Sequence, residues 1–249
     1  MAMMEPLLAL LVAPFVGSFL GVVVERLPAG RPIGLARSTC DRCGEALGVR
    51  DLVPIASWLA RGGRCRCGAI RVDPFYPAIE LAALAVALSA ALVLSGWLLW
   101  ASLALGWTLL ALAAIDLRHF VLPDVLNLPL LPAGLAVAWL IDPARLADHV
   151  IGAAAGFVGF ALIAWLYRHL RHREGLGLGD AKLLAAGGAW LGWQALPSVV
   201  ALGAVLALAV ALAATLAGGK LRATTRIAFG AYLALAIWLV WLYGPLVPM

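Results

Sequence analysis

The sequence predicts an all-α polytopic membrane protein with about eight transmembrane helices and a cysteine-containing cytoplasmic loop after the first of them. Of its 249 residues, 64% are hydrophobic and only 12% are charged, which is about half the charged fraction of a soluble domain. Only helices and closed barrels span lipid. The apolar runs are about twenty residues long, which favours helices over the alternating strands of a barrel.

The first apolar run covers residues 6–24 and carries no charge. A secretory signal peptide has basic residues before its apolar run, whereas here Glu5 precedes the run and arginines follow it. We therefore expect a retained first helix in residues 1–24, with its N-terminus outside. Residues 25–73 contain arginines, prolines, glycines and all four cysteines, and they predict a cytoplasmic domain. Residues 74–249 are expected to form a seven-helix membrane core.

The core divides into helices at turn signals. The uncharged run 81–115 is too long for one span of about 20 residues, and Ser95-Gly96 marks a turn near its middle. The run 183–219 divides in the same way at residues 194–197. The helices predicted in the core cover residues 75–94, 97–115, 125–141, 150–167, the two halves of 183–219, and 227–243.

The positions of the basic residues test this topology. With the N-terminus outside, eight spans place residues 25–73, 116–124, 168–182 and 220–226 on the cytoplasmic side. These segments hold all 18 Lys and Arg residues of the chain except Arg145. Because cytoplasmic loops carry the excess of Lys and Arg, the pattern supports the helix count and an outside C-terminus. It also explains the net charge of +5 without nucleic-acid binding, which would need basic residues interleaved with stacking aromatics.

Two aspartates lie at the ends of apolar runs. Asp116 ends one run, and Asp180 follows Gly177 and Gly179 at the start of another; the topology places both at one depth near the cytoplasmic face. Ionisable groups in membrane segments are costly and are functional candidates. Two carboxyls about 3 Å apart share one proton, so that one activates water while the other polarises a carbonyl. We predict an aspartyl protease pair, with glycines that allow close backbone approach.

A structural role for these acids is also open. Asp180 suits the N-terminal cap of a helix, whereas an acid at a helix C-terminus, as at Asp116, is disfavoured. Asp124 follows Pro123 and suits the capping role well. His119 is better explained as a residue at the membrane interface than as a metal ligand or a catalytic base.

The four cysteines occur as Cys40-Asp41-Arg42-Cys43 and Cys65-Arg66-Cys67. Since their loop is expected to face the reducing cytoplasm, metal binding outranks disulfide formation. The first spacing is typical of a zinc knuckle, and the second pair would form a tighter chelate. The sequence predicts zinc bound by Cys40, Cys43, Cys65 and Cys67, and four free thiols are the alternative.

Together these features resemble the type 4 prepilin peptidases (prepilin leader peptidase/N-methyltransferases), which are GxGD-type membrane aspartyl proteases. The resemblance covers nearly the whole chain. Asp116 with Pro123-Asp124, and Gly177-Leu178-Gly179-Asp180 with Lys182, match the motifs around the two catalytic aspartates of the family. Further matching residues are 17–20, 26–28, 37–38 before Cys40, 54, 57–59, 63–66, 76–77, 80, 183–184, 188–192 and 229–230.

The resemblance implies an inner-membrane aspartyl endopeptidase that removes the leader of type IV prepilins or type II secretion pseudopilins at the cytoplasmic face, with Asp116 and Asp180 as catalytic residues. It also implies N-methylation of the new N-terminus with S-adenosylmethionine, an activity associated with the cysteine-containing region. Three positions depart from the family pattern. Gly21 replaces an asparagine, the Cys65-x-Cys67 spacing replaces CxxC, and Ala231 replaces the proline expected after Phe-Gly; the first two bear on zinc and methylation.

Two other classes of membrane protein compete with this interpretation. An ion- or proton-coupled transporter would hold its carboxylates near the bilayer midplane, often within inverted repeats. Here both aspartates are expected at one face, and the sequence shows no internal repeat. A presenilin-like protease shares the Gly-x-Gly-Asp element, but Asp116 follows isoleucine rather than tyrosine, and the cysteine loop has no counterpart there.

Overall fold

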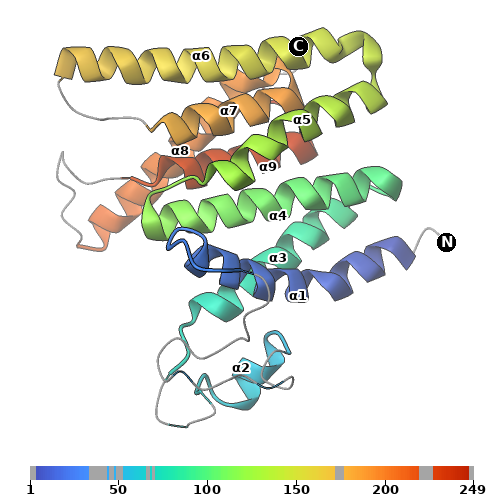
Figure 1. Ribbon diagram of the computed structural model, residues 1–249, viewed down its shortest axis with the longest axis vertical. Coiled ribbons are helices and arrows are strands. Elements are labelled where there is room, and N and C mark those ends of the chain that lie inside the picture. Colours follow the sequence, from blue (N-terminus) through green and yellow to red (C-terminus); the bar gives the residue numbers. More distant parts are fainter. Residues whose placement is uncertain are drawn as a thin grey trace. The chain divides into compact units, whose positions relative to one another are not determined.

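The computed structural model describes residues 4–33, 44, 48, 53–65, 68, 71–171, 177–218 and 227–246. Apart from one bridge between Arg64 and Arg71, the regular structure in these ranges is helical, which confirms the all-α prediction. The longer helices are α1 (Met4–Arg26), α3 (Phe75–Ala91), α4 (Gly96–His119), α5 (Asp124–Ile141), α6 (Leu146–Arg171), α7 (Leu178–Leu191), α8 (Leu196–Leu216) and α9 (Phe229–Tyr243) (Figure 1). Short helices are α2 (Ala56–Ala60), η2 (Pro143–Arg145) and η3 (Trp193–Ala195).

Each predicted span coincides with one of these long helices, but not all of them have the length of a span. Within the described ranges, five segments are long and apolar enough to cross a membrane: α1, α4, α5, Pro143–Leu170 and Trp193–Leu216. Helices α3 and α9 are apolar but shorter, and α7 has 14 residues, less than the roughly 20 needed to cross the hydrocarbon core. The protein is thus a multi-pass membrane protein, and the count of eight spans stays a prediction.

The chain divides into two compact units, Met1–Ala111 and Leu112–Met249. In the first unit, α1 packs against α3. The two backbones approach closely at Gly17, where a Cβ atom would lie 2.6 Å from Cα of Glu80. Glu80 is buried and accepts a hydrogen bond from the amide of Ile55 at 2.6 Å, which ties α3 to the residue that precedes α2.

In the second unit, α7 is the central helix. It contacts α5, α6, α8 and α9, and most of its residues from Asp180 to Trp190 are buried. It runs along α6 (Figure 1), where a Cβ atom on Gly188 would overlap the carbonyl group of Gly152. Small residues allow such close packing of membrane helices. Because four helices enclose α7, the side chains in its first turn have fixed surroundings.

Candidate active site

Asp116 and Asp180 both lie in the second unit and are buried, with 6% and 9% of their surfaces exposed. Asp180 is in the first turn of α7, so the expected start of this helix at residue 183 is wrong by more than one turn. The end expected at residue 115 for the helix that carries Asp116 is also wrong, because α4 continues past Asp116 to His119. Phe120 then ends α4 with a left-handed φ of 56°.

The two carboxylates converge on Gly230, in the first turn of α9. A Cβ atom built on Gly230 would lie 2.9 Å from Oδ1 of Asp180 and 3.0 Å from Oδ2 of Asp116. Two oxygens that lie this close to a single point are near neighbours. The structure therefore brings together the aspartates that the sequence predicts to act as a pair, and it does so at the ends of three helices.

Each carboxylate is held by backbone amides. The amide of Ala231 donates to Oδ2 of Asp116 at 3.0 Å, and the Gly230 amide also bonds this carboxylate. The amide of Gly177 donates to Oδ2 of Asp180 at 3.2 Å, while the Asp180 amide donates to the Gly177 carbonyl at 3.1 Å. Asp180 therefore does take part in capping α7, as the structural alternative proposed, and it approaches Asp116 at the same time.

Leu122 and Asn127 lie near the pair, and neither was predicted from the sequence. Leu122 is buried, and its Cβ would lie 3.0 Å from a Cβ atom on Gly179, so that only a glycine fits there without displacement. Asn127 is fully buried, and its Nδ2 donates to the Gly179 carbonyl at 3.2 Å. The available signal was a polar side chain inside the apolar run of α5, one turn after Asp124.

Asp124 and Lys182, predicted as supporting residues, form an ion pair between α5 and α7. Nζ of Lys182 lies 2.7 Å from both carboxylate oxygens of Asp124. The expected capping role of Asp124 is wrong, because Pro123 is the N-cap residue of α5 and no side chain caps the helix. The pair instead connects the helix that carries Asn127 to the helix that carries Asp180.

Three of the four predicted zinc ligands, Cys40, Cys43 and Cys67, lie outside the described residues. Cys65 is described and is buried, with 6% of its surface exposed. Within the described part of the chain, no group of three or more His, Cys, Asp or Glu side chains is placed to hold a metal ion. The zinc site stays a prediction.

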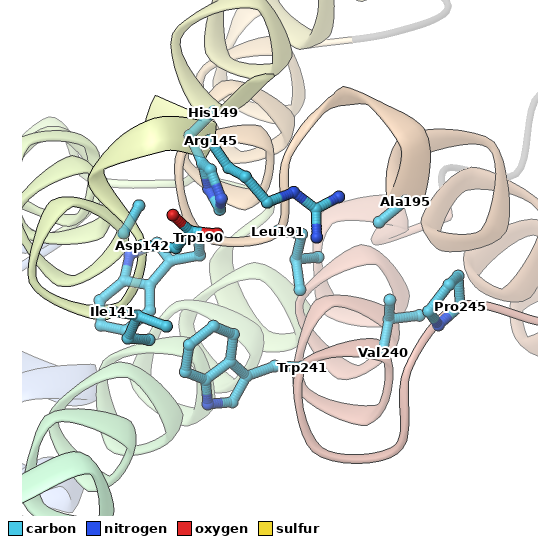
Figure 2. A pocket seen from close by; sticks show the side chains of 11 residues that line it. Ile141, Asp142, Arg145, His149, Trp190, Leu191, Ala195, Val240, Trp241 and Pro245 are labelled. Carbon is cyan, nitrogen blue, oxygen red and sulfur yellow. The ribbon is translucent and has the colours of Figure 1, made fainter. Parts of the chain in front are cut away.

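A cavity of about 320 Å³ lies at the other end of the second unit, beside Trp190 near the end of α7 and Trp241 near the end of α9 (Figure 2). Arg145, the last residue of η2, and His149, in the first turn of α6, approach it from one side (Figure 2). Its polar side chains already have partners: Asp142 accepts from the Ala144 amide, Arg145 pairs with Asp148, and His149 lies 3.1 Å from the Ala189 carbonyl. Neither Asp116 nor Asp180 lines the cavity, so the cavity is not the candidate catalytic centre.

Comparison with known proteins matches two segments of the chain to family models. Residues 103–212, which include Asp116 and Asp180, match the type IV leader peptidase family. Residues 11–94 match the bacterial peptidase A24 N-terminal domain. No solved structure matches the chain.

Curated relatives match over nearly the whole length. The prepilin leader peptidase/N-methyltransferase of Burkholderia pseudomallei (strain 1026b) is 42% identical, over 93% of this chain and 83% of its own length. The proteins of the same name from Aeromonas salmonicida (strain A449) and Pseudomonas aeruginosa are 37% and 36% identical, over 95% and 96% of this chain and 90% of their own lengths.

Proposed function

Because the chain belongs to the type IV leader peptidase family, we propose that Asp116 and Asp180 are the catalytic pair of a membrane aspartyl endopeptidase that removes the leader of prepilins. The protein cleaves prepilins and N-methylates the new N-terminus, the two activities that the names of its relatives give. We propose that its substrates are type IV prepilins or type II secretion pseudopilins. The observation that carries the assignment of the pair is the approach of both buried carboxylates to Gly230.

The chemistry needs one proton on the pair. The ionised carboxylate takes a proton from water as the water oxygen attacks the scissile carbonyl carbon, and the protonated carboxyl donates its proton to the carbonyl oxygen. When the tetrahedral intermediate collapses, the carbon–nitrogen bond breaks and the leaving amine takes the proton that the first carboxylate took from water. A hydroxyl of the intermediate returns its proton to the second carboxylate, so that the pair again holds one proton. Two buried carboxylates this close favour the singly protonated state, because two adjacent charges cannot both ionise at low cost. The neighbouring amides fix the direction in which the oxygens point.

We place this site near the cytoplasmic face of the inner membrane, with both chain termini outside. The support is the distribution of Lys and Arg, all of which except Arg145 fall in the segments expected inside. Asp116 lies near the end of α4 and Asp180 near the start of α7. Carboxylates at helix ends suit cleavage of a leader at the membrane surface better than transport through the midplane, and the comparisons give the transporter alternative no support.

N-methylation implies S-adenosylmethionine as the methyl donor, which supplies an electrophilic methyl group to the free α-amine of the cleaved pilin. The buried acid of the first unit, Glu80, already accepts from the Ile55 amide at 2.6 Å, so we assign it to structure rather than to the donor. We also propose zinc in the cysteine-containing segment 25–73. Metal analysis of the purified protein tests this: bound zinc that is lost in Cys65→Ser supports the site, and metal-free active protein excludes it.

The catalytic pair is tested by replacing each acid with its neutral isostere. In lipid-reconstituted protein, Asp116→Asn and Asp180→Asn should each lower the rate of leader removal by at least about 100-fold, since each removes a proton-transfer group. Cleavage is followed by the mobility shift of a purified prepilin.

Two controls accompany this experiment. Asp142→Asn alters an aspartate beside the cavity at the other end of the second unit and should cleave like the wild type. Methylation of a pilin supplied already cleaved should persist in all three variants, which reports on folding. Leader removal at more than one third of the wild-type rate by either variant of the pair would exclude that residue from catalysis.

A further inference from the structure

The first turn of α9, residues 229–231, is here called the α9 turn. It lies against both predicted catalytic acids, although it falls outside the matched family segment 103–212. We infer that the α9 turn is a positioning element of the catalytic centre: Gly230 leaves the reacting groups their space, and the amide of Ala231 orients Asp116. This inference rests on the proposed roles of Asp116 and Asp180.

Gly230 lies where a side chain would meet both carboxylates. A Cβ atom on Gly230 would meet Oδ1 of Asp180 at 2.9 Å and Oδ2 of Asp116 at 3.0 Å. These are hydrogen-bond distances for an oxygen atom but are too short for carbon. The backbone conformation does not require a glycine at this position, because Gly230 is not among the glycines with positive φ. What the position needs is the absence of a side chain between the two carboxylates.

Leu122 lies against the same space. Cδ1 of Leu122 would lie 2.7 Å from the same Cβ atom. This is the flexible end of a side chain in the short connection between α4 and α5, and it yields at low cost. The carboxylates cannot yield without changing their separation, because backbone amides hold both of them. An added methyl group therefore acts on the geometry of the acid pair.

The Ala231 amide donates to Oδ2 of Asp116 in a buried hydrogen bond of 3.0 Å. Proline has no amide hydrogen, so Ala231→Pro removes this donor to Asp116. Ala231→Pro should not break α9, because proline is tolerated in the first turn of a helix.

The test of the space is Gly230→Ala, with Gly159→Ala as the matched control. Both changes add one methyl group to a helix of the second unit, and alanine favours a helix more than glycine does. A Cβ atom on Gly159 meets nothing within 4 Å. We expect kcat for prepilin cleavage to fall by about 100-fold in Gly230→Ala and to stay within twofold in Gly159→Ala. Methylation of pre-cleaved pilin should be unchanged in both.

The test of orientation compares Ala231→Pro with Ala231→Gly. The proline variant should lower kcat for cleavage by roughly 3- to 10-fold, the range for one lost hydrogen bond, with KM unchanged. The glycine variant keeps the amide and should cleave at least about threefold faster than the proline variant.

Wild-type cleavage by Gly230→Ala would overturn the inference while leaving the catalytic pair intact, provided that Asp116→Asn and Asp180→Asn are inactive. If Gly230→Ala loses both cleavage and methylation, the Ala231 variants decide. Loss of cleavage in the proline variant alone supports the role of the turn, and equal cleavage by the two Ala231 variants overturns it.

Discussion

At the scale of single residues, Asn127 makes the most specific prediction. Its Nδ2 holds the Gly179 carbonyl, next to Asp180, at 3.2 Å, while its Oδ1 is buried with no hydrogen-bond partner among the described residues. Asn127→Ala removes a hydrogen bond, which costs about 1 kcal/mol, but it also removes an unpaired buried acceptor, which relieves about 1–3 kcal/mol. We expect the free energy of unfolding to change little and kcat for cleavage to fall roughly tenfold, through displacement of Asp180.

Thermal unfolding in detergent and steady-state cleavage measure the two effects separately. Asn127→Ser, which retains a shorter donor, should show an intermediate kcat, and KM should stay constant in both variants. A variant that is destabilised by several kcal/mol but cleaves at the wild-type rate would make Asn127 a packing residue and contradict the role proposed for it.

The residues that the sequence could reveal are those whose chemistry is unusual for their surroundings. Asp116 and Asp180 are conspicuous because carboxylates at the ends of apolar runs are rare. Gly230 and Ala231 act through a missing side chain and a backbone amide, which leave no mark in composition or periodicity. Their proximity to the acids depends on how α4, α7 and α9 pack in three dimensions.

At the scale of elements, the ion pair between Asp124 and Lys182 is expected to fasten α5 to α7. The two side chains are 53% and 30% exposed, so solvent screens their attraction, and the pair should contribute about 0.2–1 kcal/mol. A double-mutant cycle of Asp124→Asn and Lys182→Met, read by thermal unfolding, should give this coupling energy. High salt should reduce it. A coupling energy of zero would show that the contact does not hold the helices together.

Helix existence was easier to predict than helix ends. Apolar runs of about twenty residues indicated every long helix, but the charged residues near the termini gave the wrong limits. Asp180 lies inside α7 because its carboxylate accepts from the Gly177 amide, and Asp116 lies inside α4 because the helix continues until Phe120 adopts a left-handed conformation. Helix α7 shows a further limit, because hydropathy alone does not reveal that this helix has only 14 residues and is enclosed by four others.

At the scale of the whole molecule, the distribution of charge predicts which side of the membrane the catalytic end faces. His119 is exposed at the end of α4, close to Asp116, and Arg145 is exposed at the end of η2, beside the cavity. Cytoplasmic segments carry the excess of Lys and Arg, and Arg145 is the one Lys or Arg residue expected outside. Replacing Arg145 with cysteine only strengthens this bias, so the substitution should not invert the protein.

In spheroplasts treated with a membrane-impermeant maleimide, Arg145→Cys should be labelled, while His119→Cys should be labelled only after the membrane is permeabilised. The wild type provides the background, because its four cysteines lie in the segment expected inside and should stay unlabelled in intact spheroplasts. Labelling of His119→Cys from outside would show that the protein has the opposite orientation in the membrane. It would also place Asp116, and with it leader cleavage, on the side of the membrane opposite to the one proposed.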